Sequence, residues 1–196
     1  MPLKLQEADT EADLLAIAQA MIEAYEQKVV DVETGRIAAG ALWSICRENP
    51  FTKPKTITAP WFPEDSREYA EEALKMHAKP RSQIAQRPHI YLFIIFTHHE
   101  YRRQGAAQQI MDWGTRKADE LGLEMFLDSS SMAKPLYELN GFVAVQDNLV
   151  HPQKSDPDEK WKEMERAVGP FTLTVMWRPV GGKYEERKTR KPWESA

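Results

Sequence analysis

The sequence predicts an α/β protein of the α+β type, in which a mixed sheet is flanked by helices. Two observations carry this prediction. Residues 28–32 and 37–45 are β-compatible runs joined by a turn that contains Gly35, a pattern typical of an antiparallel hairpin. The apolar run 90–96 is then followed by an amphipathic stretch over 105–121, so that a buried central strand leads directly into a helix.

The N-terminal region predicts a strand at 3–5 and a single helix before the hairpin. Thr10 and Asp13 form the pattern of a helix start. The apolar residues that follow recur at helical spacing: Leu14, Leu15, Ala18, Met21, Ile22 and Tyr25.

Residues 47–88 contain six prolines, which argues against a continuous strand or helix and predicts a segment that is mostly loop. Within it, 65–79 is interpreted as a short amphipathic helix. The aromatic residues Trp61, Phe62 and Tyr69 favour an ordered flap over a disordered tether.

The C-terminal half predicts alternating strands and helices. Helix 105–121 is expected to end at Gly122 in a left-handed cap and to bury one face: Ala106, Ile110, Met111, Gly114 and Ala118. A strand at 125–128, a helix at 135–139 and strands at 142–145 and 171–177 follow, with a charged surface loop at 149–169 that holds a helical turn around 161–166.

Length and charge favour one domain and a small-molecule partner. A chain of 196 residues suits one core-bearing domain, taken as 1–182, followed by a polar, disordered tail at 183–196. A formal net charge of −4 gives no reason to bind nucleic acid or a membrane surface. Cys46 is the single cysteine, so a disulfide framework is excluded, and we interpret it as a buried hydrophobic residue. The first residues do not have the apolar stretch of a signal peptide. We therefore expect a cytoplasmic protein.

The turn between the central strand and its helix predicts an anion site. The residues are Arg102, Arg103, Gln104, Gly105, Ala106, Ala107 and Gln108. Backbone N–H groups at a helix start lack partners, the helix dipole adds positive charge, and small side chains let an anion approach. Two arginines at the mouth of the turn favour contact with phosphate.

This turn resembles motif A of the GNAT-superfamily N-acetyltransferases, through Arg102-x-x-Gly105-x-Ala107. Ser130-x-x-Ala133-x-x-Leu136-Tyr137-x-x-x-Gly141-Phe142 resembles a second family motif, with Ser130 where asparagine is usual. The resemblance implies a mostly antiparallel central sheet. It also implies acetyl-CoA as cosubstrate, with its pyrophosphate at 102–108 and its pantetheine arm paired with the backbone of Ile95 and Thr97, and it assigns Ser130 to the cofactor site.

The same resemblance implies that Tyr137 is the general acid for the departing thiolate, although an aromatic residue on a packed helix face is also expected in a core. No single proton acceptor stands out, because several polar side chains lie near strand ends: His89, His98, His99, Glu100 and Asp128. His98, His99 and Glu100 are consecutive, so their side chains point in different directions, and we expect no metal site.

The function expected from the resemblance is transfer of an acetyl group to a primary amine of a small molecule. Relatives usually place two helices before the hairpin, whereas here one helix runs almost directly into Lys28. This shortened helical region leaves open an alternative, a non-catalytic acyl-CoA-binding module. A dinucleotide binder is disfavoured because no Gly-x-Gly-x-x-Gly occurs. The identity of the amine, the base and the oligomeric state are left open.

Overall fold

The computed structural model describes residues 3–7, 23–53 and 56–194, and within them the chain forms one seven-stranded sheet in the order β1-β2-β3-β4-β5-β7-β6. The strands are β1 (Leu3–Glu7), β2 (Glu23–Asp31), β3 (Ile37–Cys46), β4 (His89–Thr97), β5 (Glu124–Ser129), β6 (Val143–Val150) and β7 (Phe171–Arg178). Neighbouring strands are antiparallel except β4 and β5, which are parallel. The predicted mixed, mostly antiparallel sheet and the hairpin at 28–45 are confirmed.

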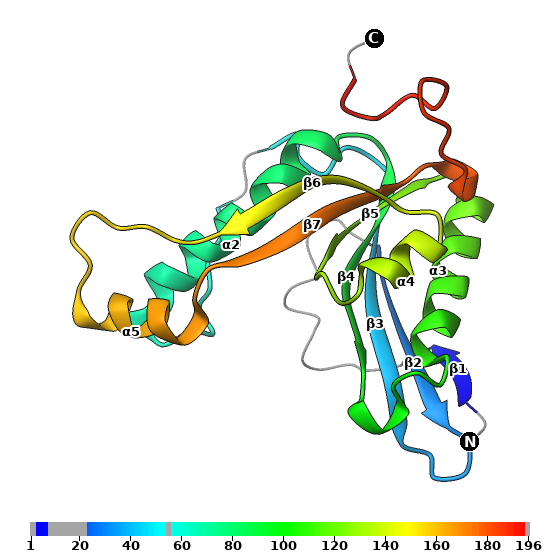
Figure 1. The fold of residues 1–196 in the computed structure, drawn as a ribbon, viewed down its shortest axis with the longest axis horizontal. Helices are drawn as coiled ribbons and strands as arrows, with labels where there is room; N and C mark the ends of the chain where they lie inside the picture. The colour runs from blue at the N-terminus through cyan, green and yellow to red at the C-terminus, as the bar shows by residue number, and fades with distance from the viewer. Residues whose placement is uncertain (1–2, 8–22, 54–55, 195–196) are drawn as a thin grey trace.

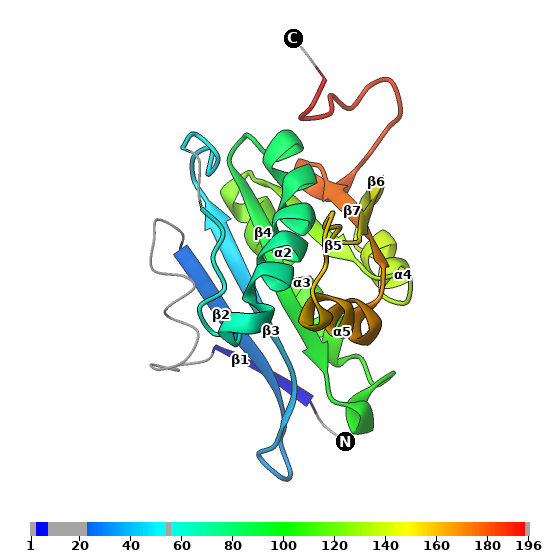
Figure 2. The same ribbon diagram turned by 90° about the vertical axis from the view of Figure 1, so that its left-hand side faces the viewer.

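Within the described ranges, four α-helices lie around this sheet: α2 (Glu64–Ile84), α3 (Ala106–Leu121), α4 (Lys134–Leu139) and α5 (Glu159–Val168). Helix α3 lies along one side of β2–β4, whereas α2 crosses the opposite side (Figures 1 and 2). The five residues expected on the buried face of α3 are all buried, and Gly122 ends the helix in the left-handed conformation with φ 65°. The sequence therefore predicted the buried face and the end of α3, and it placed the start one residue early, at Gly105.

The sheet opens between β4 and β5. Their pairing covers only His89–Leu92 and Glu124–Leu127. Beyond it, β6 and β7 extend away from the lower ends of β3 and β4, so that the sheet divides into two arms (Figure 1). The β3–β4 register also shifts at this level, between Leu42 and Trp43.

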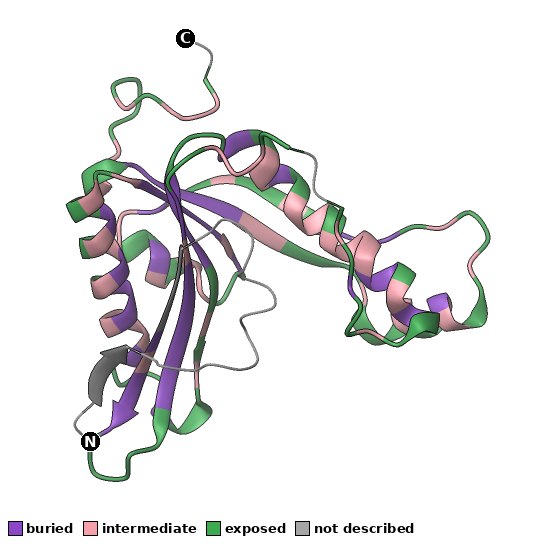
Figure 3. Cartoon of the chain, turned by 180° about the vertical axis from the view of Figure 1, so that it is seen from behind, coloured by how far each residue is buried: buried purple, intermediate pink, exposed green. Residues whose placement is uncertain are grey.

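Two hydrophobic cores lie on opposite faces of the sheet. The larger one contains Leu92 and Leu127 with the buried residues of α3. The smaller one contains Tyr91 and Phe126 with Ile84 at the end of α2. Figure 3 shows the buried residues concentrated in β2–β5 and on the inner side of α3, while much of the far arm is exposed.

The central segment differs from the prediction, because α2 has 21 residues and contains Pro80 in its interior. Proline lacks the N–H that would bond to the carbonyl oxygen four residues earlier, here that of Met76. The side chain of Asn148 on β6 donates instead to the carbonyl oxygens of Met76 and His77, at 3.2 and 3.3 Å. A tertiary contact thus satisfies the carbonyl group that the proline leaves free.

Three other expectations need correction. The loop at 149–169 contains the full helix α5, capped by Asp158, whose carboxylate accepts a hydrogen bond from the backbone N–H of Trp161 at 2.8 Å. The tail is not disordered throughout, because the ring of Trp193 lies 5.5 Å from that of Trp177. Tyr25, expected to end the N-terminal helix, belongs to β2, and the rest of that helix, within 10–22, lies outside the described residues.

Candidate active site

The predicted phosphate turn lies between β4 and α3 and has a constrained backbone. A short 3-10 helix at His99–Tyr101 follows β4, and α3 begins at Ala106. Arg103 and Gly105 both adopt left-handed conformations, with φ 63° and 83°. This conformation costs a non-glycine residue about 1–2 kcal/mol, and strained residues of this kind cluster at functional sites.

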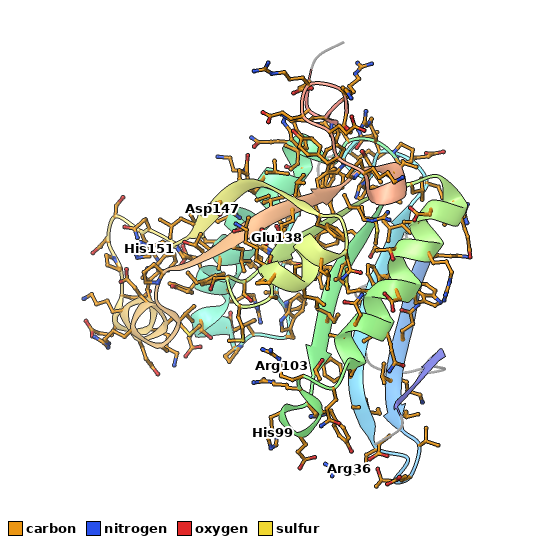
Figure 4. All side chains as sticks on the ribbon, turned by 45° about the vertical axis from the view of Figure 1, so that its right-hand side comes forward. Arg36, His99, Arg103, Glu138, Asp147 and His151 are labelled. Atoms are coloured by element: carbon orange, nitrogen blue, oxygen red, sulfur yellow. The ribbon has the colours of Figure 1, made fainter. Side chains whose placement is uncertain are left out.

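The turn offers unpaired donors. The backbone N–H groups of Ala106, Ala107 and Gln108 have no acceptor among the described residues, as expected for the first turn of a helix. A Cβ built on Gly105 would meet no atom within 4 Å, so an anion could approach the turn there. Figure 4 shows the Arg103 side chain projecting from the ribbon into open space.

A contact between side chains joins this turn to the second motif. The amide of Gln108 donates to the side-chain oxygen of Asn140 at 2.9 Å, and the amide of Asn140 donates back to that of Gln108 at 3.2 Å. Gln108 stands in the first turn of α3, and Asn140 directly follows α4. The reciprocal pair therefore fixes the start of α3 against the helix that carries Tyr137.

The β4 edge beyond the opening is free to bond a ligand. His98 donates its backbone N–H to Ala38 on β3, and Thr97 pairs with Ala39. Because backbone groups alternate along an antiparallel strand, those of Ile95 and Thr97 face away from β3, toward the gap. Ser130 directly follows β5 across that gap, and its exposed side chain has no hydrogen-bond partner among the described residues.

The expectation that β4 is covered on both faces holds only for its first half. Phe93, Ile94 and Phe96 are 43%, 44% and 46% exposed. Ile95 packs against the α3-side core, so its alternating neighbours Ile94 and Phe96 face the α2 side. An apolar surface therefore lies beside the gap on the α2 side.

Tyr137 lies on the α3 face, in the larger core, and is 3% exposed. Burial raises the pKa of its phenol to about 12, so the hydroxyl stays protonated at neutral pH. The hydroxyl has no hydrogen-bond partner among the described residues, although it is not fully enclosed. Tyr137 is thus both a core residue and a free hydrogen-bond donor.

The structure separates the five residues considered as bases. Burial lowers the pKa of His89 to about 4, and its Nδ1 lies 2.7 Å from the carbonyl oxygen of Arg87, so this ring is neutral and engaged. His98 packs edge-on against Phe96, while His99 and Glu100 are exposed on the 3-10 helix. Of the five, only Asp128 is buried beside the end of the β4–β5 pairing.

Asp128 has a histidine partner that the sequence did not single out. The Nε2 atom of His77 lies 3.0 Å from Oδ2 of Asp128. His77 is on α2, 51 residues earlier in the chain, and its helical spacing indicated only a packed face. No group of three or more metal-ligating side chains occurs within the described parts of the chain.

Part of the chain matches a known family model. Residues 67–152 match the family model described as an acetyltransferase (GNAT) domain. No curated protein matches the chain significantly. None of the described helices is long and apolar enough to cross a membrane.

Two solved structures share the fold. Arylalkylamine N-acetyltransferase 2 from Aedes aegypti is 14% identical, with a TM-score of 0.51, and the match covers 79% of this chain and 73% of that one. The polyamine N-acetyltransferase of Drosophila melanogaster is 13% identical, with a TM-score of 0.51, over 79% of this chain and 74% of that one. The family model confirms the resemblance to the GNAT superfamily, and the two structures confirm the fold.

Proposed function

We propose, on the premise that residues 67–152 belong to a GNAT acetyltransferase domain, that this chain transfers an acetyl group from acetyl-CoA to a primary amine. The observation that carries the proposal is the gap between β4 and β5, which has unpaired N–H groups at one end and the helix of Tyr137 beside it. Acetyl-CoA supplies the acetyl group as an activated thioester. The acceptor is a small-molecule amine, and the reaction needs no metal.

The residues present fit acetyl-CoA at three points. The amides at the start of α3, with Arg102 and Arg103 beside them, would hold the pyrophosphate. The outward backbone groups of Ile95 and Thr97 would bond to the pantetheine arm as an added strand does. Ser130 would donate its hydroxyl across the same gap.

Tyr137 would hold a proton at its hydroxyl until the sulfur leaves as a thiolate. Its raised pKa keeps it protonated at neutral pH but also makes complete transfer to a thiolate, whose conjugate acid has a pKa near 8.5, unfavourable. A hydrogen bond from the phenol that stabilises the departing sulfur is therefore the role that fits its burial.

The exposed apolar residues on the α2 side of β4 suit an amine with an apolar portion. Ile94 and Phe96 lie beside the gap, and burying such side chains under a ligand is favourable by about 25 cal/mol per Å². The direct test is incubation with acetyl-CoA and phenethylamine, agmatine, spermidine or an unblocked peptide, followed by mass spectrometry. Acetylated phenethylamine is the expected product. Binding of acetyl-CoA without any product would favour the non-catalytic module.

Ala107→Glu should abolish acetyl-CoA binding while leaving the fold intact. The introduced carboxylate would stand in the first turn of α3, where it would repel a pyrophosphate and accept the free N–H groups itself. Isothermal calorimetry measures the affinity, and circular dichroism checks the fold. Ala107→Gln, similar in size but neutral, should lose less affinity. Equal losses in the two variants would mean that side-chain size, and not charge, blocks the site.

A further inference from the structure

A buried carboxylate connects three elements on the α2 face of the sheet. Oδ2 of Asp128 on β5 accepts a hydrogen bond of 2.6 Å from the hydroxyl of Tyr91 on β4 and lies 3.0 Å from Nε2 of His77 on α2. The side chain of Asp128 is 6% exposed, whereas that of His77 is 33% exposed. The carboxylate is therefore inside, and the imidazole reaches the surface.

This cluster lies where the sheet opens. Asp128 directly follows Leu127, the last residue of β5 that pairs with β4. Its side chain points to the same face as Phe126, two residues earlier, in the α2-side core. Tyr137 belongs to the core on the other face. A thioester held in the gap would therefore have the phenol of Tyr137 on one side and the imidazole of His77 on the other.

The contact differs from an ion pair that only holds the fold together. Between Asp119 and Arg178, both carboxylate oxygens are bonded, at 2.8 and 3.0 Å, and Oδ1 accepts a further backbone N–H from Gly181. In Asp128, by contrast, Oδ1 is buried and has no donor. Leaving such an oxygen unbonded costs about 1–3 kcal/mol, so Asp128 is less completely satisfied than Asp119.

The carboxylate also determines which ring nitrogen of His77 can accept a proton. When the imidazole is neutral, Nε2 must carry the hydrogen in order to donate it to Asp128. The lone pair is then on Nδ1, which has no hydrogen-bond partner among the described residues. Asn148 holds the backbone of His77 in place by donating to its carbonyl oxygen at 3.3 Å.

We propose that His77 is the catalytic base of the acetyl transfer and that Asp128 is the positioning residue that orients it; the assignment rests on the function proposed above. The amine nitrogen forms a bond to the acetyl carbonyl carbon, and the C–S bond breaks with its electron pair going to sulfur. Nδ1 of His77 takes the proton that the nitrogen loses. Tyr137 donates a hydrogen bond to the departing thiolate, which takes a proton from water, and His77 releases the proton it took to water, so the products are an amide and a free thiol.

The polar and charged groups around His77 lie on β5, β4, α2 and β6. Asp128 and Tyr91 bond within it, and the guanidinium of Arg81 on α2 lies 3.8 Å from the centre of the Tyr91 ring. The residue of β6 in this group, Asn148, carries no charge. Protonation of His77 removes its lone pair, so the rate should fall on the acid side of the pH profile.

The first test is His77→Gln, whose amide can still donate to Asp128 but cannot act as a base. We expect kcat/KM for phenethylamine, or for whichever amine of the panel is acetylated fastest, to fall about 10²- to 10⁴-fold, with unchanged acetyl-CoA affinity and without the acid-side decline. His151→Gln is the matched control. His151 contacts Glu165 at 3.2 Å with similar exposure, at the far arm near α5 (Figure 4), and its loss should leave the rate unchanged.

The second test does not depend on turnover. Asp128→Asn replaces the carboxylate that accepts from Nε2 of His77 by an amide, so the neutral ring should no longer be held with its hydrogen on Nε2, which the ¹⁵N chemical shifts of the two ring nitrogens report. The value of kcat/KM should fall while acetyl-CoA affinity stays unchanged. Identical ¹⁵N shifts of the His77 ring in the wild type and Asp128→Asn would overturn the positioning role.

Two results separate this proposal from the proposed function. If the wild type acetylates an amine and the folded His77→Gln variant retains the same rate and pH profile, the base assignment is wrong and the acetyltransferase assignment stands. If the wild type binds acetyl-CoA but acetylates no amine in the panel, both assignments are wrong.

Discussion

At the scale of single residues, the site combines groups whose chemistry depends on burial. The ring of Tyr137 packs in the α3-side core, and its phenol keeps its proton. Asp128 is enclosed in the opposite face and holds the imidazole of His77. The same sheet thus places a proton donor and a proton acceptor on either side of one gap.

Tyr137→Phe should lower kcat about 10²- to 10⁴-fold with little effect on acetyl-CoA affinity, because it removes only the hydroxyl that would stabilise the departing sulfur. Steady-state kinetics with chemistry shown to be rate-limiting tests this prediction. The ring of Tyr137 packs against Phe142 at 6.0 Å, and phenylalanine keeps that contact. Full turnover in the variant would make Tyr137 a packing residue.

The sequence predicted those candidate residues whose position depends on local order. The turn 102–108 follows from a strand, a glycine and an amphipathic helix in succession, and the structure has all three. His77 was missed as a candidate base because its contact with Asp128 spans 51 residues and depends on how α2 crosses the sheet. No spacing rule connects two such residues, so only the tertiary structure brings them together.

At the scale of elements, α2 shows why the central segment was interpreted as mostly loop. The proline rule is local, whereas the group that compensates for Pro80 is the side chain of Asn148 on another strand. The rule describes an isolated helix correctly. It fails here because β6 lies beside α2 and supplies the missing donor.

Asn148→Ala should lower the free energy of unfolding by about 1–2 kcal/mol, since it leaves the carbonyl oxygen of Met76 without a donor. The loss should be smaller when Pro80→Ala is also present, because the new backbone N–H can bond that oxygen. Urea denaturation of the four proteins gives the coupling energy, expected at about 0.5–1.5 kcal/mol. Gln146→Ala, at an exposed position on the same strand, is the control. Fully additive losses in the double variant would contradict the inference that the Asn148 amide replaces the backbone N–H that Pro80 lacks.

At the scale of the whole molecule, the strands of the sheet were predictable from the sequence, whereas the packing of the C-terminal residues was not. Alternating apolar runs indicated the strands, but the polar composition of 183–196 hid two aromatic residues, Tyr184 and Trp193, that pack against Trp177. Single large side chains in a polar stretch carry no periodic signal. Their partner lies on β7, in the core shared with α2.

Burial of His89 makes the stability of the fold depend on pH. The residue begins β4, is 1% exposed, and packs edge-on against Phe126 at 5.2 Å. Burial lowers its pKa from 6.5 to about 4, while its hydrogen bond to the Arg87 carbonyl opposes that change only in part. The unfolded chain therefore binds a proton below pH 6.5 that the folded chain does not bind until near pH 4.

The contribution of His89 to the free energy of unfolding should consequently be fully present above pH 6.5. It should fall by about 3 kcal/mol as the pH decreases to 4, since each unit of pKa difference contributes about 1.4 kcal/mol. Urea denaturation at a series of pH values measures this slope, to which other groups also contribute. The contribution of His89 is the part that disappears in His89→Phe, which keeps an aromatic ring against Phe126. His99→Gln, at an exposed position, should retain the wild-type slope. If His89→Phe loses stability with the same slope as the wild type, His89 is already protonated in the folded state, and the two cores do not exclude its charge.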